Sequence, residues 1–147
     1  MDSNDFALEH LSRNECMRLM ASVPVGRIVY TRQALPAVEL VNFALADGDI
    51  VIRTDAGGKL TAAISGAVVA FEADSVDSAR HAGWSVTAIG RCEAVTDDTE
   101  SARLRETGLR PWAPGRRDHF IKITPVILTG RQLNVKHTME TGNGCHP

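Results

Sequence analysis

The residues best suited to chemistry in this chain lie between positions 53 and 60, where basic and hydroxyl side chains flank a glycine pair. Arg53-Thr54 ends a β-branched run, Gly57-Gly58 forms a turn, and Lys59 opens a helix predicted over 59–65. A helix N-terminus presents unpaired N–H groups and a partial positive charge, so it stabilises a bound anion. A lysine in the first turn opposes the helix dipole unless an anion offsets it. The segment is therefore predicted to cradle a phosphate group, with a solvated loop as the alternative interpretation.

The same segment differs from the phosphate loop of nucleotide hydrolases, which follows the pattern G-x-x-x-x-G-K-[ST]. Arg53 stands where the first glycine of that pattern belongs, and Leu60 replaces the hydroxyl residue that binds magnesium. The five histidines show no close pairing of the kind that binds zinc, and none lies beside a nucleophile motif. We therefore predict no metal site and no hydrolytic triad.

Composition favours one soluble domain. The chain has 147 residues and a formal net charge of −2, which argues against a nucleic-acid partner. No apolar run approaches the roughly 18–20 residues of a membrane span. The three cysteines, Cys16, Cys92 and Cys145, are odd in number and widely spaced, which indicates reduced thiols and a cytoplasmic protein. We expect Cys16 and Cys92 in the core and Cys145 in an exposed tail.

Hydrophobic alternation and turn residues predict a mainly β chain. Strands are expected over 26–31, 36–45, 49–54, 67–72, 84–94 and 119–133, the last one broken near Pro125. Capping patterns at Ser12–Glu15 and Asp97–Glu100 begin two helices, in addition to the helix over 59–65. Six strands with three short helices suggest a closed antiparallel barrel. We divide the chain into a flexible N-terminus (1–10), a barrel domain (11–134) and a C-terminal tail (135–147).

Two further groups of charged residues have more than one interpretation. Arg27 could meet a phosphate or pair with a carboxylate such as Glu39 or Glu72, and the structural ion pair is favoured. Glu72 and Asp74 could form a carboxylate pair for acid–base chemistry, although a solvated strand end is the favoured interpretation.

The order of short motifs along the chain closely resembles that of the pyridoxamine 5'-phosphate oxidase-like, flavin-binding split-barrel proteins. The motifs are Gly26-Arg27-Ile28, Pro36-Ala37-Val38, Val41-Asn42-Phe43-Ala44, Ile52-Arg53-Thr54, Gly58-Lys59-Leu60, Val69-Ala70-Phe71-Glu72, Gly83-Trp84-Ser85-Val86, Gly90-Arg91, Leu109-Arg110-Pro111-Trp112-Ala113-Pro114-Gly115 and Thr129-Gly130-Arg131. No single motif is diagnostic, but their ordered combination is fairly specific and covers nearly the whole stretch from Leu11 to Arg131. The resemblance strengthens the phosphate interpretation of 53–60.

The resemblance implies a six-stranded antiparallel split β-barrel with Greek-key topology that forms a homodimer. Two molecules of flavin mononucleotide (FMN) would lie in clefts between the subunits. By position, Arg53, Thr54 and Lys59, followed by Leu60, would hold the FMN phosphate.

The resemblance also places residues around the flavin ring. The backbone and side chains of Val41, Asn42 and Phe43 would run beside the reactive edge of the ring. Trp84 and Ser85 would close the cleft, contributed by the other subunit. An ordinary core aromatic is an equally good interpretation of Trp84.

These features together predict an FMN-binding oxidoreductase that transfers hydride or electrons to or from a small organic substrate. Oxidation of vitamin B6 is disfavoured, because no second phosphate clamp follows Arg131. One alternative is a deazaflavin-dependent reductase, which the basic residues Arg110, Arg116 and Arg117 would permit. Another is a non-enzymatic carrier or sensor that holds flavin, or haem through His81 or His119.

Overall fold

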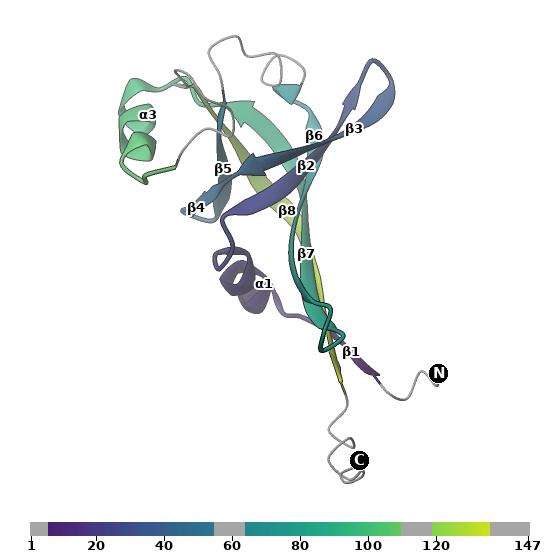
Figure 1. Cartoon of the computed structure of the whole chain (residues 1–147). Coiled ribbons are helices and arrows are strands. Elements are labelled where there is room, and N and C mark those ends of the chain that lie inside the picture. The colour runs from purple at the N-terminus through teal and green to yellow at the C-terminus, as the bar shows by residue number, and fades with distance from the viewer. Residues whose placement is uncertain (1–5, 55–63, 110–118, 136–147) are drawn as a thin grey trace, which may run out of the picture.

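The computed structural model describes residues 6–54, 64–109 and 119–135 (Figure 1). The strands are β1 (Phe6–His10), β2 (Val25–Arg32), β3 (Leu35–Asn42), β4 (Ala44–Ala46), β5 (Asp49–Thr54), β6 (Val68–Asp77), β7 (Ala82–Ala94) and β8 (His119–Val135). The helices are α1 (Arg13–Met20) and α3 (Asp98–Arg105). Most of the helix predicted over 59–65 lies outside the described residues, as does Cys145.

The strands form one curled sheet in the order β3-β2-β6-β7-β8-β5-β4, with β1 added to β8. Every pairing is antiparallel. In Figure 1, α3 lies at the same end as β4 and β5, whereas β1 and the β6–β7 turn lie at the far end. The predicted fold class, a mainly β antiparallel split barrel with short helices, is confirmed.

The sheet has eight strands where six were predicted. The strand predicted over 36–45 divides at Phe43, because β3 pairs with β2 as far as Asn42 while Ala44 pairs with Val51 of β5. The N–H group of Phe43 donates to the carbonyl of Pro24. This hydrogen bond fixes the chain at the point where it leaves β2 and begins to pair with β5.

The other additional strand, β1, lies within the segment predicted to be a flexible N-terminus. Leu8 pairs with Leu133, so the far end of β8 supplies this segment with backbone hydrogen bonds. The polar composition of residues 1–10 gave no indication of this pairing, because it depends on a partner more than 100 positions away in the sequence. Residues 6–10 are therefore part of the sheet.

A bulge shapes the long β7–β8 ribbon. Ile89 pairs with Ile127 and Gly90 pairs with Pro125, which leaves Val126 without an opposite residue. A Cβ atom on Gly90 would lie 1.9 Å from the carbonyl oxygen of Thr124, so only glycine fits there. The predicted bend at Gly90 is confirmed, while the predicted break near Pro125 is this bulge within a continuous strand.

Two apolar clusters support the sheet. The main core includes Cys16 and Met20 of α1 together with Phe71, and Cys92 is also fully buried, as predicted for both cysteines. Burial raises the pKa of the Cys92 thiol to about 12, which keeps it protonated and unreactive. A smaller cluster of Val51, Leu104, Leu109 and Phe120 joins α3 to the β5–β8 edge.

Both predicted helix starts are confirmed. Ser12 accepts a hydrogen bond from the Glu15 N–H group in a full capping box at α1. Asp97 accepts from the Glu100 N–H group at α3. Lys122 of β8 also donates to the Glu100 carboxylate at 3.0 Å, so α3 is fixed to the sheet at its first turn.

Candidate functional site

The end of β5 carries the first part of the predicted phosphate cradle. The Arg53 guanidinium donates to the Leu109 carbonyl at 3.2 Å and lies 5.5 Å from the centre of the Phe120 ring. The Thr54 hydroxyl donates to the His119 carbonyl at 3.4 Å, and Thr54 is only 7% exposed. Because successive strand residues point to opposite faces, Arg53 faces the α3 side and Thr54 faces the barrel interior. Lys59 and Leu60 lie outside the described residues.

Residues 41–43 lie near this end of β5, because β3 leads directly into β4, which pairs with β5. The side chains of Val41 and Phe43 are buried, and the Phe43 ring meets the Phe71 ring edge-on at 4.8 Å. Asn42 is half-buried and belongs to the opposite face of the strand. This segment can therefore offer a ligand its backbone groups and the Asn42 side chain, while Val41 and Phe43 hold it in place.

Trp84 and Ser85 begin β7 at the far end of the sheet. They border a hollow of about 600 Å³, called here the β7 hollow. Its lining residues are Leu8, Asp74, Val76, His81, Ala82, Gly83, Trp84, Ser85, Arg131 and Leu133. Trp84 also packs against the main core, which agrees with its interpretation as a core aromatic. Its role in closing a flavin cleft stays a prediction.

The predicted residues thus gather at two separate places in one chain. Arg53 pairs with Phe120 of β8, whereas Trp84 pairs with Gln132. The stretch of β8 between these partners is roughly 40 Å long, measured along the strand at about 3.3 Å per residue. Residues 41–43 and 53–54 lie at one end, and Trp84-Ser85 lie at the other.

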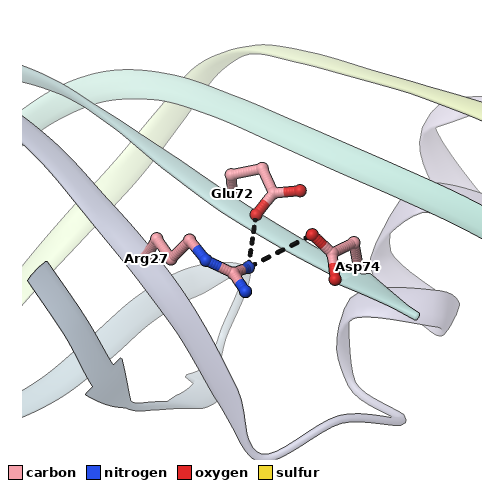
Figure 2. A network of polar contacts seen from close by, with 3 residues as sticks. All are labelled: Arg27, Glu72 and Asp74. Atoms are coloured by element: carbon pink, nitrogen blue, oxygen red, sulfur yellow. Dashed lines mark hydrogen bonds and ion pairs between the residues drawn. The ribbon is translucent and has the colours of Figure 1, made fainter. Parts of the chain in front are cut away.

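A charged network lies on the sheet face next to the β7 hollow (Figure 2). Nη1 of Arg27 lies 3.0 Å from Oε1 of Glu72 and 3.1 Å from Oδ2 of Asp74. The structural ion pair between Arg27 and Glu72 is confirmed, whereas Glu39 accepts a hydrogen bond from Tyr30 instead. The predicted solvated strand end is wrong, because β6 continues to Asp77 and both carboxylates are half-buried.

Burial is the main cause of an unusual titration in this network. It raises the pKa of Glu72 to about 7, and the neighbouring Asp74 carboxyl raises it further through a hydrogen bond and its charge. The Arg27 guanidinium acts in the opposite direction. The network therefore holds a proton near neutral pH.

Sequence reasoning missed the contribution of Asp74 and Arg131 to the β7 hollow. The register places Asp74 opposite Ser85, and Ser85 opposite Arg131. The β6–β7 turn between Asp77 and Ala82 sets that register. Predicting this turn as a hairpin would have aligned Asp74 with Ser85 from the sequence alone.

Within residues 6–54, 64–109 and 119–135, no three His, Cys, Asp or Glu side chains are grouped closely enough to hold a metal ion. In the same part of the chain, neither α1 nor α3 has the length and apolar character needed to cross a membrane.

Comparison with known proteins places this fold and site in a family. Residues 12–132 match the model of the pyridoxamine 5'-phosphate oxidase family. The chain belongs to this family. Uncharacterized protein Rv0080 of Mycobacterium tuberculosis is 42% identical to this chain over 128 residues, which cover 84% of each chain.

Solved structures agree with the family assignment. The structure of an FAD binding protein from Mycobacterium smegmatis is 31% identical, with a TM-score of 0.67, and the match covers 86% of this chain and 98% of that one. A protein from Corynebacterium glutamicum, provisionally named a pyridoxamine 5'-phosphate oxidase, is 29% identical with a TM-score of 0.76. That match covers 93% of this chain and 99% of the other. The split barrel of this family therefore extends over nearly all of the chain.

Proposed function

We propose that the protein is a flavin-dependent oxidoreductase that binds FMN and acts on a small organic substrate. The observation that carries this proposal is the family match over residues 12–132, together with a 31% identical structure whose protein binds FAD. A bound flavin supplies hydride or electron transfer, so the chain needs residues that bind and orient it and no hydrolytic machinery of its own.

The described residues fit this cofactor at the end of β5. The Arg53 guanidinium is held against Phe120 and the Leu109 carbonyl directly before segment 55–63. There it can donate charge-assisted hydrogen bonds to a phosphate, with Lys59 as the second donor. The Thr54 side chain lies on the opposite face of β5 and donates to the His119 carbonyl, so it supports the end of the strand instead. Segment 41–43 would lie beside the ring. FAD is the second candidate cofactor because of the Mycobacterium smegmatis protein.

A homodimer is part of the proposal. In one chain Trp84 and Ser85 lie at the opposite end of β8 from Arg53, so we propose that they reach the cofactor of a second copy. The outer face of the sheet offers a surface for that copy. An apolar outer row crosses five strands through residues that are paired in register: Val38, Val29, Ala70, Ile89 and Ile127. Val38 is 60% exposed and Ile127 is 51% exposed in the single chain.

We also propose a cytoplasmic location. Cys16 and Cys92 are free thiols, which is the usual state of cysteines in a reducing compartment.

The first test is the visible absorption spectrum of the protein after incubation with FMN and gel filtration. Wild-type protein should retain flavin bands, and Lys59→Ala and Arg53→Ala should lose most of them. Mass spectrometry of the cofactor released from protein purified without added FMN then distinguishes FMN, FAD and a deazaflavin. If the wild type retains none of these, the proposal is wrong.

A second test separates an enzyme from a carrier. The flavin-loaded protein is mixed with NADH or NADPH and menadione, a quinone acceptor. An oxidoreductase should consume the nicotinamide nucleotide faster than free flavin does. A carrier or sensor would retain the flavin without accelerating this reaction.

A further inference from the structure

The β7 hollow lies on the outer face of the sheet, where two rows of paired residues form its floor. One row is polar and consists of Asp74, Ser85 and Arg131. The next row consists of Val76, Gly83 and Leu133 and is apolar. A ligand in the β7 hollow therefore meets an apolar floor with a carboxylate at one side and a guanidinium at the other.

The Asp74 carboxylate is held from behind by Arg27, whose Nη1 also binds Glu72 (Figure 2). One guanidinium thus serves two neighbouring carboxyl groups. Two carboxylates at such close range are difficult to ionise together, so they retain one proton between them. Their side chains are 25% exposed for Glu72 and 31% exposed for Asp74, which limits solvation of a second negative charge.

Basic side chains contact the pair or line the β7 hollow from β2, from β8 and from the turn before β7. Arg27 faces the pair from β2, and Arg131 lies beyond Ser85 on β8, where it pairs with His10 of β1. His81 lines the β7 hollow from the turn before β7. Arg27 favours the ionised form of Glu72, whereas burial, followed by the Asp74 carboxyl, raises the pKa of Glu72 to about 7. The balance leaves a proton that can be released and regained near neutral pH.

We propose that Asp74 is the catalytic proton donor and acceptor for a substrate bound in the β7 hollow, with Glu72 and Arg27 as its positioning residues. This inference rests on the proposed function, since the reduced flavin of the partner subunit is the hydride donor. One atom of a polarised C=O or C=C bond in the substrate gains the hydride. The other atom gains the proton that Glu72 and Asp74 share, which Asp74 delivers because it is the member of the pair that lines the β7 hollow. The substrate is reduced, the flavin is oxidised, and the carboxyl pair is left with both groups ionised beside Arg27.

The lining also defines the substrate class. Val76 and Leu133 suit a flat apolar body, and Arg131 suits a carbonyl or carboxylate oxygen at its edge. A neutral or anionic carbonyl compound or quinone fits this surface. A substrate with two positive charges would encounter Arg131 unfavourably.

The first experiment follows the side-chain carboxyl carbons of ¹³C-labelled protein by NMR from about pH 4 to about pH 9. The wild-type Glu72 signal should have its midpoint near 7. Asp74→Asn should lower that midpoint by more than about one pH unit, because the like charge and shared proton are removed. Asp77→Asn, on the same strand but paired with Arg80, should leave it unchanged, as should His81→Gln. The amide spectrum of each variant establishes that it is folded.

The second experiment measures reoxidation of the dithionite-reduced, FMN-loaded protein by menadione without oxygen. The wild-type rate should fall as pH rises above about 7. Asp74→Asn should lower the rate at about pH 6 by at least about tenfold, since general acid catalysis contributes roughly 10²–10⁴-fold. Glu72→Gln should shift the pH at which the rate falls. Asp74→Glu, which keeps a carboxyl group, should retain more of the wild-type rate than Asp74→Asn does.

Each outcome has a distinct meaning. A Glu72 midpoint below about 5.5 overturns the shared proton. An Asp74→Asn rate and pH profile equal to wild type overturn the catalytic role even if the proton is shared. A wild-type protein that retains no flavin overturns the proposed function, and the proton-transfer role fails with it, while the NMR result stands on its own.

Discussion

At the scale of single residues, the raised pKa of Glu72 makes stability depend on pH. Between its usual value of 4.5 and about 7, the folded protein keeps a proton that the unfolded chain has released. The stabilising contribution is therefore complete below 4.5 and is lost as pH rises through about 7. The wild-type free energy of unfolding should decrease between about pH 5 and about pH 8 by about 1–2 kcal/mol more than that of Glu72→Gln, after allowance for solvent screening. Urea unfolding at the two pH values measures this difference, and parallel profiles for both proteins would contradict it.

Gly90 provides a second test at the residue scale. A methyl group at this position would lie 1.9 Å from the Thr124 carbonyl oxygen, which is backbone and cannot rotate away. Gly90→Ala should therefore force β7 and β8 apart at the bulge and destabilise the protein by about 2–3 kcal/mol. Thermal or urea unfolding gives the value, with the exposed Glu93→Ala on the same strand as the matched control. Equal stability of the two variants would mean that the bulge relaxes without loss.

At the scale of elements, sequence patterns correctly predicted the helices and strands that local interactions stabilise. The N-cap patterns at Ser12 and Asp97 located both described helices, and the alternation from Trp84 to Ala94 located β7. The strand over 36–45 was predicted as one element because its residues have β propensity throughout. Its division at Phe43 depends on which strands its two halves pair with. The pairing partners are determined by the tertiary fold, and local β propensity does not predict them.

Helix α3 illustrates how an element supports the site. Leu104 anchors it in the smaller cluster with Leu109 and Phe120, the two residues that also contact Arg53. Leu104→Ala should cost about 2–4 kcal/mol of stability and raise the Kd for FMN by about tenfold, because Arg53 loses its support. Met20→Ala, in the main core, should cost similar stability without raising the Kd. Fluorescence titration with FMN measures the Kd of both variants. An unchanged Kd in Leu104→Ala would show that α3 does not support the flavin site.

At the scale of the whole molecule, the candidate site could be predicted only in part. Residues 53–60 carry a local chemical signal, so the sequence alone indicated an anion there. The sequence indicated Asp74 only as a possible carboxylate partner of Glu72, and its place beside Arg131 was not predicted, because the two meet only through the registers of β6, β7 and β8. Trp84 was assigned through family resemblance, and in the single chain it lies at the opposite end of β8 from Arg53.

The assembly itself gives the last prediction. The outer row ends at Ile127, which is exposed in the single chain and would be buried if a second copy covers this face. Ile127→Glu places a charge in that interface, where burying it without a partner is strongly unfavourable. We expect the variant to be a folded monomer that retains little flavin, because Trp84 and Ser85 of a second copy no longer reach the cleft. Leu35→Glu adds the same negative charge at the β2–β3 turn, where Leu35 is 68% exposed. This variant should remain a dimer with normal flavin content. Sedimentation equilibrium measures the oligomeric state of each variant, and flavin absorbance of the same samples measures its cofactor content. A dimeric Ile127→Glu protein would show that this face is not the interface, and a monomer that keeps its flavin would show that one chain suffices for binding.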